Sequence, residues 1–241
     1  MLEKIVWLAL VCLIVVFFCL RMEVIHFSTF TPIFSASLLI AFLGGLALTG
    51  VMIFRLYKNK PTKITQVVTS LGGMLPVALL VFNLSPQAGV FPAIHDITTD
   101  QQQPPQFVLA AKDRVDGDNP VAYDFANLEA QQKSYPSLQS LKVQRDQEAV
   151  QSAVESVVQQ MDWRLLGTRE GDGWYLEAVA TTAVFRFRDD VVIRVRPVNV
   201  DGETLIEVAV RSASRVGLGD MGTNAKRIIA FFEALQAELA S

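Results

Sequence analysis

Three long apolar runs fill the first third of the chain, and each has about the length of a membrane-spanning helix. They are Leu2–Leu20, Ile33–Phe54 and Ile64–Leu84, and the second contains no charged residue. About 20 helical residues cross a hydrocarbon core that is about 30 Å thick. The pattern therefore predicts a membrane anchor over residues 1–84, with transmembrane helices at about 2–20, 33–54 and 64–84 and the lipid bilayer as a partner.

A signal peptide is the alternative interpretation of the first run, because Lys4 supplies a short positive region in front of it. The run is longer than the apolar core of a typical signal peptide, and no small-residue cleavage site follows it before His26. We therefore expect a helix that is retained in the membrane.

The placement of lysine and arginine predicts the orientation of the anchor. Four basic residues lie in the loop 55–63 and Lys4 precedes the first run, whereas only Arg21 lies between the first two runs. Loops rich in lysine and arginine stay in the cytoplasm. We therefore expect a bacterial inner-membrane protein with a cytoplasmic N-terminus and, after three crossings, a periplasmic C-terminal domain.

The polar remainder of the chain begins with residues 85–145, where prolines and glutamines interrupt any long periodicity. Scattered apolar residues such as Phe107 and Phe125 are unusual in a free linker. We therefore expect an irregular arm that wraps around a folded core. A short strand at Gln106–Ala110 is compatible with the pattern, but a long helix is not.

Residues 146–241 show the periodicity of an α+β core. Apolar residues repeat at the helical three-to-four spacing across Arg145–Met161 and again across Asp220–Leu239. Between them lie four strand candidates separated by short turn sequences, namely Trp163–Arg169, Trp174–Phe187, Val191–Pro197 and Thr204–Ser212. Connections this short make neighbouring strands antiparallel. The predicted fold class is α+β, with three N-terminal transmembrane helices followed by an α-β-β-β-β-α domain with an antiparallel sheet.

Arginines alternate with apolar residues on both sides of Asp189-Asp190, which we interpret as a hairpin turn. If this loop holds three residues, the arginines share one face of the sheet, because a shift of one residue moves every side chain to the other face. The predicted face consists of Arg186, Arg188, Arg194 and Arg196. Two interpretations remain open: these arginines pair with the carboxylates of the domain, or they bind a ligand.

The charge of the domain argues against nucleic acid as a partner. Of the 21 Lys and Arg and the 24 Asp and Glu residues in the chain, six and two lie before residue 85, which leaves 15 against 22 in the domain. A nucleic-acid-binding surface needs an excess of basic residues to neutralise phosphates. Both cysteines, Cys12 and Cys19, lie in the first apolar run, so a disulfide framework in the domain is excluded.

The densest run of hydrogen-bonding side chains is Arg211–Arg227, where the last strand candidate leads through a glycine-rich turn into the final helix. The candidate ligand-binding residues are Arg211, Ser212, Arg215, Asp220, Asn224, Arg227 and, from the arginine-rich face, Arg194. An anionic or polyhydroxyl group held by arginines and an amide is one interpretation. The other is a capping and salt-bridge network that fixes the final helix to the sheet.

The segment Gly217-Leu-Gly-Asp-Met-Gly222 matches the dinucleotide-binding pattern G-x-G-x-x-G between a strand and a helix. Only 19 residues of this sequence follow Gly222. They are too few for the helix and the second parallel strand that would complete a βαβ dinucleotide-binding unit. Asp220 is also expected to cap the helix at the place where a pyrophosphate would bind. We therefore interpret the glycines as a tight turn that needs positive φ, and we expect no nucleotide cofactor.

Several separated motifs occur in a defined order along the domain. They are His95–Asp100, Pro104-Pro105, Asn119-Pro120, Tyr135-Pro136, Phe187–Arg194 and the run Arg211-Ser-Ala-Ser-Arg215 with Asp220, Asn224 and Arg227-Ile228. In these motifs the chain resembles the DUF1499 family of uncharacterised proteins over about residues 91–241. Members resemble secreted, lipid-anchored or membrane-anchored envelope proteins. The resemblance implies one domain in the cell envelope and no particular activity.

The residues favour binding over catalysis. The domain has a single histidine, His95, and no cysteine, so it lacks the usual ligands of a zinc site and the usual base for a serine nucleophile. We expect no metal and no cofactor. We interpret the chain as a membrane-anchored periplasmic domain that binds a ligand or a protein partner in the cell envelope. The alternative is an envelope enzyme that acts on an anionic substrate through the Arg211–Arg227 cluster.

Overall fold

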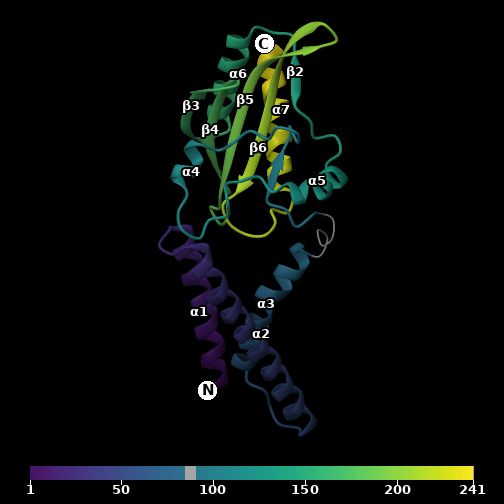
Figure 1. Ribbon diagram of the computed structural model, residues 1–241. Coiled ribbons are helices and arrows are strands. Elements are labelled where there is room, and N and C mark those ends of the chain that lie inside the picture. The colour runs from purple at the N-terminus through teal and green to yellow at the C-terminus, as the bar shows by residue number, and fades with distance from the viewer. Residues whose placement is uncertain (85–90, 241) are drawn as a thin grey trace. The chain divides into compact units, whose positions relative to one another are not determined.

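The computed structural model describes residues 1–84 and 91–240 of the chain. These residues belong to two compact units, Met1–Ala88 and Gly89–Ser241. The described part of the first unit consists of helices and their connections, and the second combines helices with an antiparallel sheet (Figure 1).

The first unit confirms the prediction of three apolar N-terminal helices. They are α1 (Leu2–Arg21), α2 (Phe27–Tyr57) and α3 (Ile64–Leu84), and each is long and apolar enough to cross a membrane. The helix α2 begins six residues before the predicted run, because the side chain of His26 accepts a hydrogen bond from the backbone N–H of Ser28 and caps the helix. The observed helix therefore includes a polar first turn that hydropathy alone does not find.

Small residues allow α2 and α3 to approach closely. A Cβ atom on Gly73 would collide with the backbone carbonyl of Ala41, and one on Gly45 would lie 2.8 Å from the carbonyl oxygen of Ser70. The Ser70 hydroxyl donates a hydrogen bond of 2.9 Å to the carbonyl oxygen of Gly45 across the same contact. Close backbone approach and hydrogen bonds of this kind hold membrane helices together.

The second unit is built around a sheet that has six strands in the described residues. The strands are β1 (Asp96–Thr98), β2 (Leu141–Val143), β3 (Arg164–Glu170), β4 (Trp174–Thr181), β5 (Arg188–Val200) and β6 (Glu203–Ser214). The helices are α4 (Leu109–Asp113), η2 (Phe125–Asn127), α5 (Leu128–Ser134), α6 (Gln147–Gln160) and α7 (Thr223–Ala240). The strand order is β1-β6-β5-β4-β3, β2 also pairs with β6, and all pairs are antiparallel (Figure 1). The predicted α+β fold with an antiparallel sheet is confirmed.

The arm contributes more regular structure than the sequence predicts. Its segments β1 and β2 both pair with β6 and extend the sheet beyond the four predicted strands. The predicted strand at Gln106–Ala110 is wrong, since α4 begins at Leu109. Strands of three residues are too short to show an alternating pattern, and their partner β6 lies far away in the sequence.

The predicted hairpin turn at Asp189-Asp190 is also wrong. The strand β4 ends at Thr181, β5 begins at Arg188, and Asp190 lies opposite Val179 inside the sheet. Aspartate is typical of turns, but both of these aspartates are buried and form ion pairs with arginines of neighbouring segments. Ion pairing therefore overrides the local turn preference.

The two faces of the sheet differ in chemistry. One face packs against α6 and α7 and forms the main hydrophobic core, with buried residues that include Leu176, Ile193, Val208, Ile228 and Phe231. The opposite face carries Arg194, Arg196 and Arg211, which the β5–β6 register places on one side. The predicted arginine-rich face is thus confirmed for Arg188, Arg194 and Arg196, which alternate along β5, whereas Arg186 lies in the connection before β5.

We predict that Gly73→Ala destabilises the first unit by about 1–3 kcal/mol, because the added methyl group overpacks the contact with Ala41. Thermal unfolding of the full chain in detergent, followed by circular dichroism, measures the effect. Gly50→Ala is the matched control, since nothing lies within 4 Å of its added Cβ. Equal melting temperatures for the two variants would contradict the predicted packing.

Candidate functional site

The face of the sheet opposite α6 and α7 is covered by the arm. The buried apolar residues there form a small cluster that includes Phe107, Ala110, Tyr175, Val192 and Ala213. Most of this face is ionic: Glu177, Asp190, Arg194, Arg211 and Arg215 are all nearly inaccessible to solvent. Burying a charge costs several kcal/mol unless it is paired and hydrogen-bonded, so the partners of these groups define the site.

Arg211 is completely buried and binds the arm in several places. Its Nε and Nη2 atoms donate hydrogen bonds of 2.9 and 2.6 Å to the carboxylate of Asp96, and its guanidinium also donates to the carbonyl oxygens of Pro105 and Val121. The rings of Phe107 and Tyr123 lie 4.6 and 5.3 Å from the guanidinium carbon. Burial and the nearby charge of Asp96 raise the pKa of Tyr123 to about 12.

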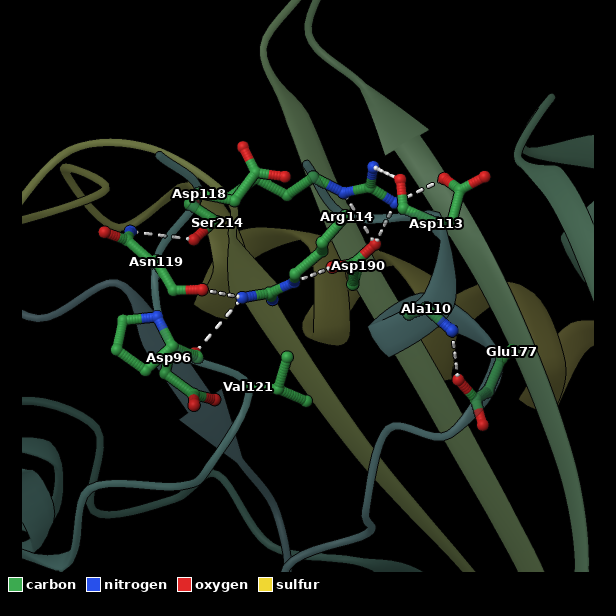
Figure 2. A network of polar contacts seen from close by, with 12 residues as sticks. Asp96, Ala110, Asp113, Arg114, Asp118, Asn119, Val121, Glu177, Asp190 and Ser214 are labelled. Atoms are coloured by element: carbon green, nitrogen blue, oxygen red, sulfur yellow. Dashed lines mark hydrogen bonds and ion pairs between the residues drawn. The ribbon is translucent and has the colours of Figure 1, made fainter. Parts of the chain in front are cut away.

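Asp190 joins two arginines on the same face (Figure 2). Its carboxylate accepts hydrogen bonds from Nε and Nη2 of Arg215 at 3.0 and 2.6 Å and from Nε of Arg114 at 2.7 Å. Arg215 also donates to the carboxylate and the carbonyl of Asp113. Burial alone would lower the pKa of Arg215, but its hydrogen bonds with Asp190 and Asp113 raise the pKa above its ordinary value.

Glu177 fixes the start of α4. Its carboxylate is fully buried and accepts hydrogen bonds from the backbone N–H groups of Val108, Leu109 and Ala110. Figure 2 shows the bond from Ala110. Arg169 forms an ion pair with it at 3.3 Å. A carboxylate at a helix N-terminus satisfies donors that have no partner within the helix. The sequence analysis missed this role, because nothing in the local pattern of β4 points to α4.

Arg194 holds the segment that follows β1. Its Nη2 atom donates a hydrogen bond of 2.6 Å to the carboxylate of Asp100, and its Nη1 atom donates to the carbonyl oxygen of Gln103. Nη2 of Arg196 lies 3.4 Å from Oδ2 of the same Asp100 carboxylate, and Nε of Arg196 donates a hydrogen bond of 3.0 Å to Oε1 of Glu207. The two arginines therefore neutralise two carboxylates at the side of the sheet where β2 pairs with β6.

The polar residues before and within α7 form a second network on the helix side of the sheet. Asp220 accepts hydrogen bonds of 2.8 Å from the backbone N–H groups of Gly222 and Asn224, as the capping interpretation predicts. Asn224 accepts from the hydroxyl of Ser212 and donates to the carbonyl oxygen of His95. Arg227 forms an ion pair with Asp189. The network fixes α7 to the sheet and to the segment before β1.

The predicted ligand-binding residues are therefore divided between two places. Arg194, Arg211 and Arg215 lie on the face covered by the arm. The others, Ser212, Asp220, Asn224 and Arg227, lie on the helix side. All seven are buried or nearly so, and each is hydrogen-bonded within the domain. The glycine-rich turn has positive φ at Gly217 and Gly222, as the turn interpretation predicts.

Among the described residues, no group of three or more His, Cys, Asp or Glu side chains has the geometry to hold a metal ion. The ionic groups of the covered face are instead bound to one another. Their arrangement stabilises the arm and presents few free donors or acceptors for chemistry.

A polar cavity lies beside the arginine-rich face, between the segment after β1, α5 and β2. Its volume is about 590 Å³. It is lined by Thr99, Asp100, Gln101, Gln102, Leu128, Gln132, Pro136, Leu138, Gln139, Ser140, Lys142 and Glu207. The sequence analysis missed this cavity, because four segments that are separate in sequence assemble it.

The fold and the buried network together define an α+β domain that follows three apolar helices in the chain. Ion pairs attach the arm of this domain to one face of its sheet. The model of a family described as a protein of unknown function, DUF1499, matches residues 96–235, which is more than half of the chain. The chain belongs to this family. The matched region begins at β1 and ends within α7, so it includes the arm as well as the core. A search of curated proteins finds no match.

We predict that Arg211→Met destabilises the domain by about 3–5 kcal/mol, because it leaves the buried carboxylate of Asp96 without its partner. Urea unfolding of the full chain in detergent, followed by tryptophan fluorescence, measures the change. Arg164→Met is the control, since the exposed ion pair of Arg164 with Asp113 contributes about 1 kcal/mol or less. A similar small loss in both variants would contradict the structural importance of the Arg211 pair.

Proposed function

We propose that the protein is a membrane-anchored binding protein whose α+β domain lies on the non-cytoplasmic side of the membrane. In a bacterium this is the periplasm. We further propose that the domain binds a ligand of the cell envelope in the polar cavity between α5, β2 and the segment after β1. The cavity carries this proposal, because it presents many hydrogen-bonding groups to solvent, whereas the buried arginines of the covered face are paired with carboxylates of the domain.

The walls of the cavity are held in place by buried contacts, which supports a preformed site. The side-chain amide of Gln131 accepts from the backbone N–H of Thr98 and donates to its carbonyl oxygen, which attaches α5 to β1. The hydroxyl of Thr99 accepts from the backbone N–H of Val210 in β6. The cavity volume of about 590 Å³ lies within the range of about 300–1,000 Å³ that is usual for small-molecule sites.

The predicted site residue Arg194 contributes to this cavity indirectly. It positions Asp100, whose carboxylate lies on the cavity wall. A role for the remaining candidates, Arg211, Ser212, Arg215, Asp220, Asn224 and Arg227, in binding requires that the arm or α7 moves away from the sheet. We propose that their function is to keep these elements in place.

The carboxylates and hydroxyls around the cavity are already engaged in ion pairs and hydrogen bonds, which favours binding over catalysis. The carboxylates of Asp100 and Glu207 are bound by Arg194 and Arg196, and the hydroxyls of Thr99 and Ser140 are 3.2 Å apart. A nucleophile needs a neighbouring base that can take its proton, and these contacts supply none.

The orientation is tested by cysteine labelling. In a chain with Cys12→Ser and Cys19→Ser, the exposed residue Ser137 is replaced by cysteine, and intact cells or spheroplasts are treated with a membrane-impermeant maleimide. We expect labelling of Ser137→Cys in intact preparations. The matched variant Lys60→Cys, in the loop between α2 and α3, should be labelled only after the cells are opened. The opposite pattern would reverse the proposed topology.

Ligand binding is tested by filling the cavity. Gln139→Trp places a large side chain at the cavity wall from an exposed position, and Gln159→Trp makes the same change on the outer face of α6. The melting temperature of the full chain is measured with neutral oligosaccharides, polar tetrapeptides and sugar phosphates. We expect one class of probe to stabilise the wild type and the Gln159 variant but not the Gln139 variant. If no class stabilises the wild type, or if the Gln139 variant responds equally, the proposed function is wrong.

A further inference from the structure

We propose that the ligand of the cavity is an oligosaccharide, an inference that rests on the proposed function and names the chemical class of its ligand. The wall of the cavity carries little uncompensated charge. Asp100 pairs with Arg194 at 2.6 Å and Glu207 pairs with Arg196 at 3.0 Å, so both carboxylates are neutralised from within the protein. Lys142 is the remaining charged residue of the lining, and it is exposed to solvent.

A wall of this kind suits a neutral ligand. A strongly charged ligand loses its hydration on entering a site and needs several opposite charges to compensate for the loss. The paired carboxylates do not attract a cation, and Lys142 alone is a weak site for a phosphorylated ligand. The cavity thus differs from the clusters of arginine that bind phosphate groups.

The polar groups of the lining match hydroxyl groups in kind. Four carboxamides line the cavity, those of Gln101, Gln102, Gln132 and Gln139, and two hydroxyls accompany them. Each carboxamide both donates and accepts hydrogen bonds, as does each hydroxyl. A sugar ring presents several hydroxyls at short spacing, and each of them also donates and accepts. The wall therefore has the mixed donor and acceptor surface that a polyhydroxyl ligand requires.

One pair of these amides is already oriented by the fold. Nε2 of Gln132 donates a hydrogen bond of 2.8 Å to Oε1 of Gln101, which links α5 to the segment after β1. The bond uses the carbonyl oxygen of Gln101 and one N–H of Gln132, which leaves the Gln101 amino group and the Gln132 carbonyl oxygen for a ligand. Groups that are fixed before binding lose less conformational entropy when the ligand arrives.

The apolar part of the lining is small, and this separates a saccharide from a peptide or a lipid. Three of the twelve lining residues are apolar, namely Leu128, Pro136 and Leu138. Peptides are usually recognised through apolar anchor pockets, aromatic grooves or a free strand edge. Three aliphatic side chains are enough to contact the C–H face of one sugar ring, but they form no pocket for an acyl chain.

The test is isothermal titration calorimetry on the full chain in a zwitterionic detergent, because detergents with sugar head groups would compete. The probes are a neutral β-linked tetrasaccharide of glucose, the corresponding tetrasaccharide of N-acetylglucosamine, a polar tetrapeptide and glucose 6-phosphate. We expect a neutral tetrasaccharide to bind. Gln132→Ala should weaken its binding about fivefold to tenfold, since it removes one to two hydrogen bonds.

Two further measurements separate the sources of binding. Raising the salt concentration should change the affinity for a neutral tetrasaccharide by less than about twofold, because the binding of a neutral ligand does not depend on the charge of Lys142. Gln159→Ala, on the outer face of α6, should leave it unchanged.

The outcomes distinguish this inference from the proposed function. Binding of the peptide or of glucose 6-phosphate without binding of either tetrasaccharide would overturn the oligosaccharide inference and leave the binding function in place. A loss of affinity at high salt that exceeds the loss in Gln132→Ala would overturn it as well. If none of the four probes binds, the proposed function itself fails.

Discussion

The structure of the domain depends on the neutralisation of charges that are buried on one face of its sheet. Arg211 and Arg194 lie on strands and Arg215 directly follows β6, and their carboxylate partners Asp96, Asp100 and Asp113 lie on the arm. A sheet without the arm would expose three cations next to an apolar surface, and an arm without the sheet has no core of its own. Each therefore stabilises the other. The family match covers the arm and the core together.

The same contacts create the cavity. Arg194 fixes Asp100 and the following residues, and Gln131 fixes α5 beside β1. These two attachments fix segments that line the cavity, so the cavity is a product of how the arm is bound to the sheet. The ionic network and the candidate binding site are therefore connected physically, even though most members of the network are inaccessible to a ligand.

The helices were predictable from the sequence, because their apolar residues form local patterns. The contacts between segments that are distant in the sequence were not predictable. Hydropathy identified the three apolar helices, and the spacing of valines such as Val150 and Val154 identified α6, because these patterns are local. The pairing of β1 and β2 with β6 and the burial of Asp189 and Asp190 depend on partners that are distant in sequence. The cavity depends on four such segments. The cap at Asp220 was predicted because its acceptors and donors lie within four residues.

The pairing of β1 with β6 also determines when the domain can complete its folding. Asp96 and Arg211 are separated by 115 positions in the chain. During synthesis the arm therefore emerges long before its partner strand, and its acidic residues must remain solvated until β6 is available. Closing so long a loop slows folding and lengthens the time for which partly folded chains are exposed to proteases and to aggregation. A chain released before β6 would lack the partner strand of β1 and the ion pair between Arg211 and Asp96. The arm can therefore be fixed to the sheet only when synthesis of the chain is nearly complete.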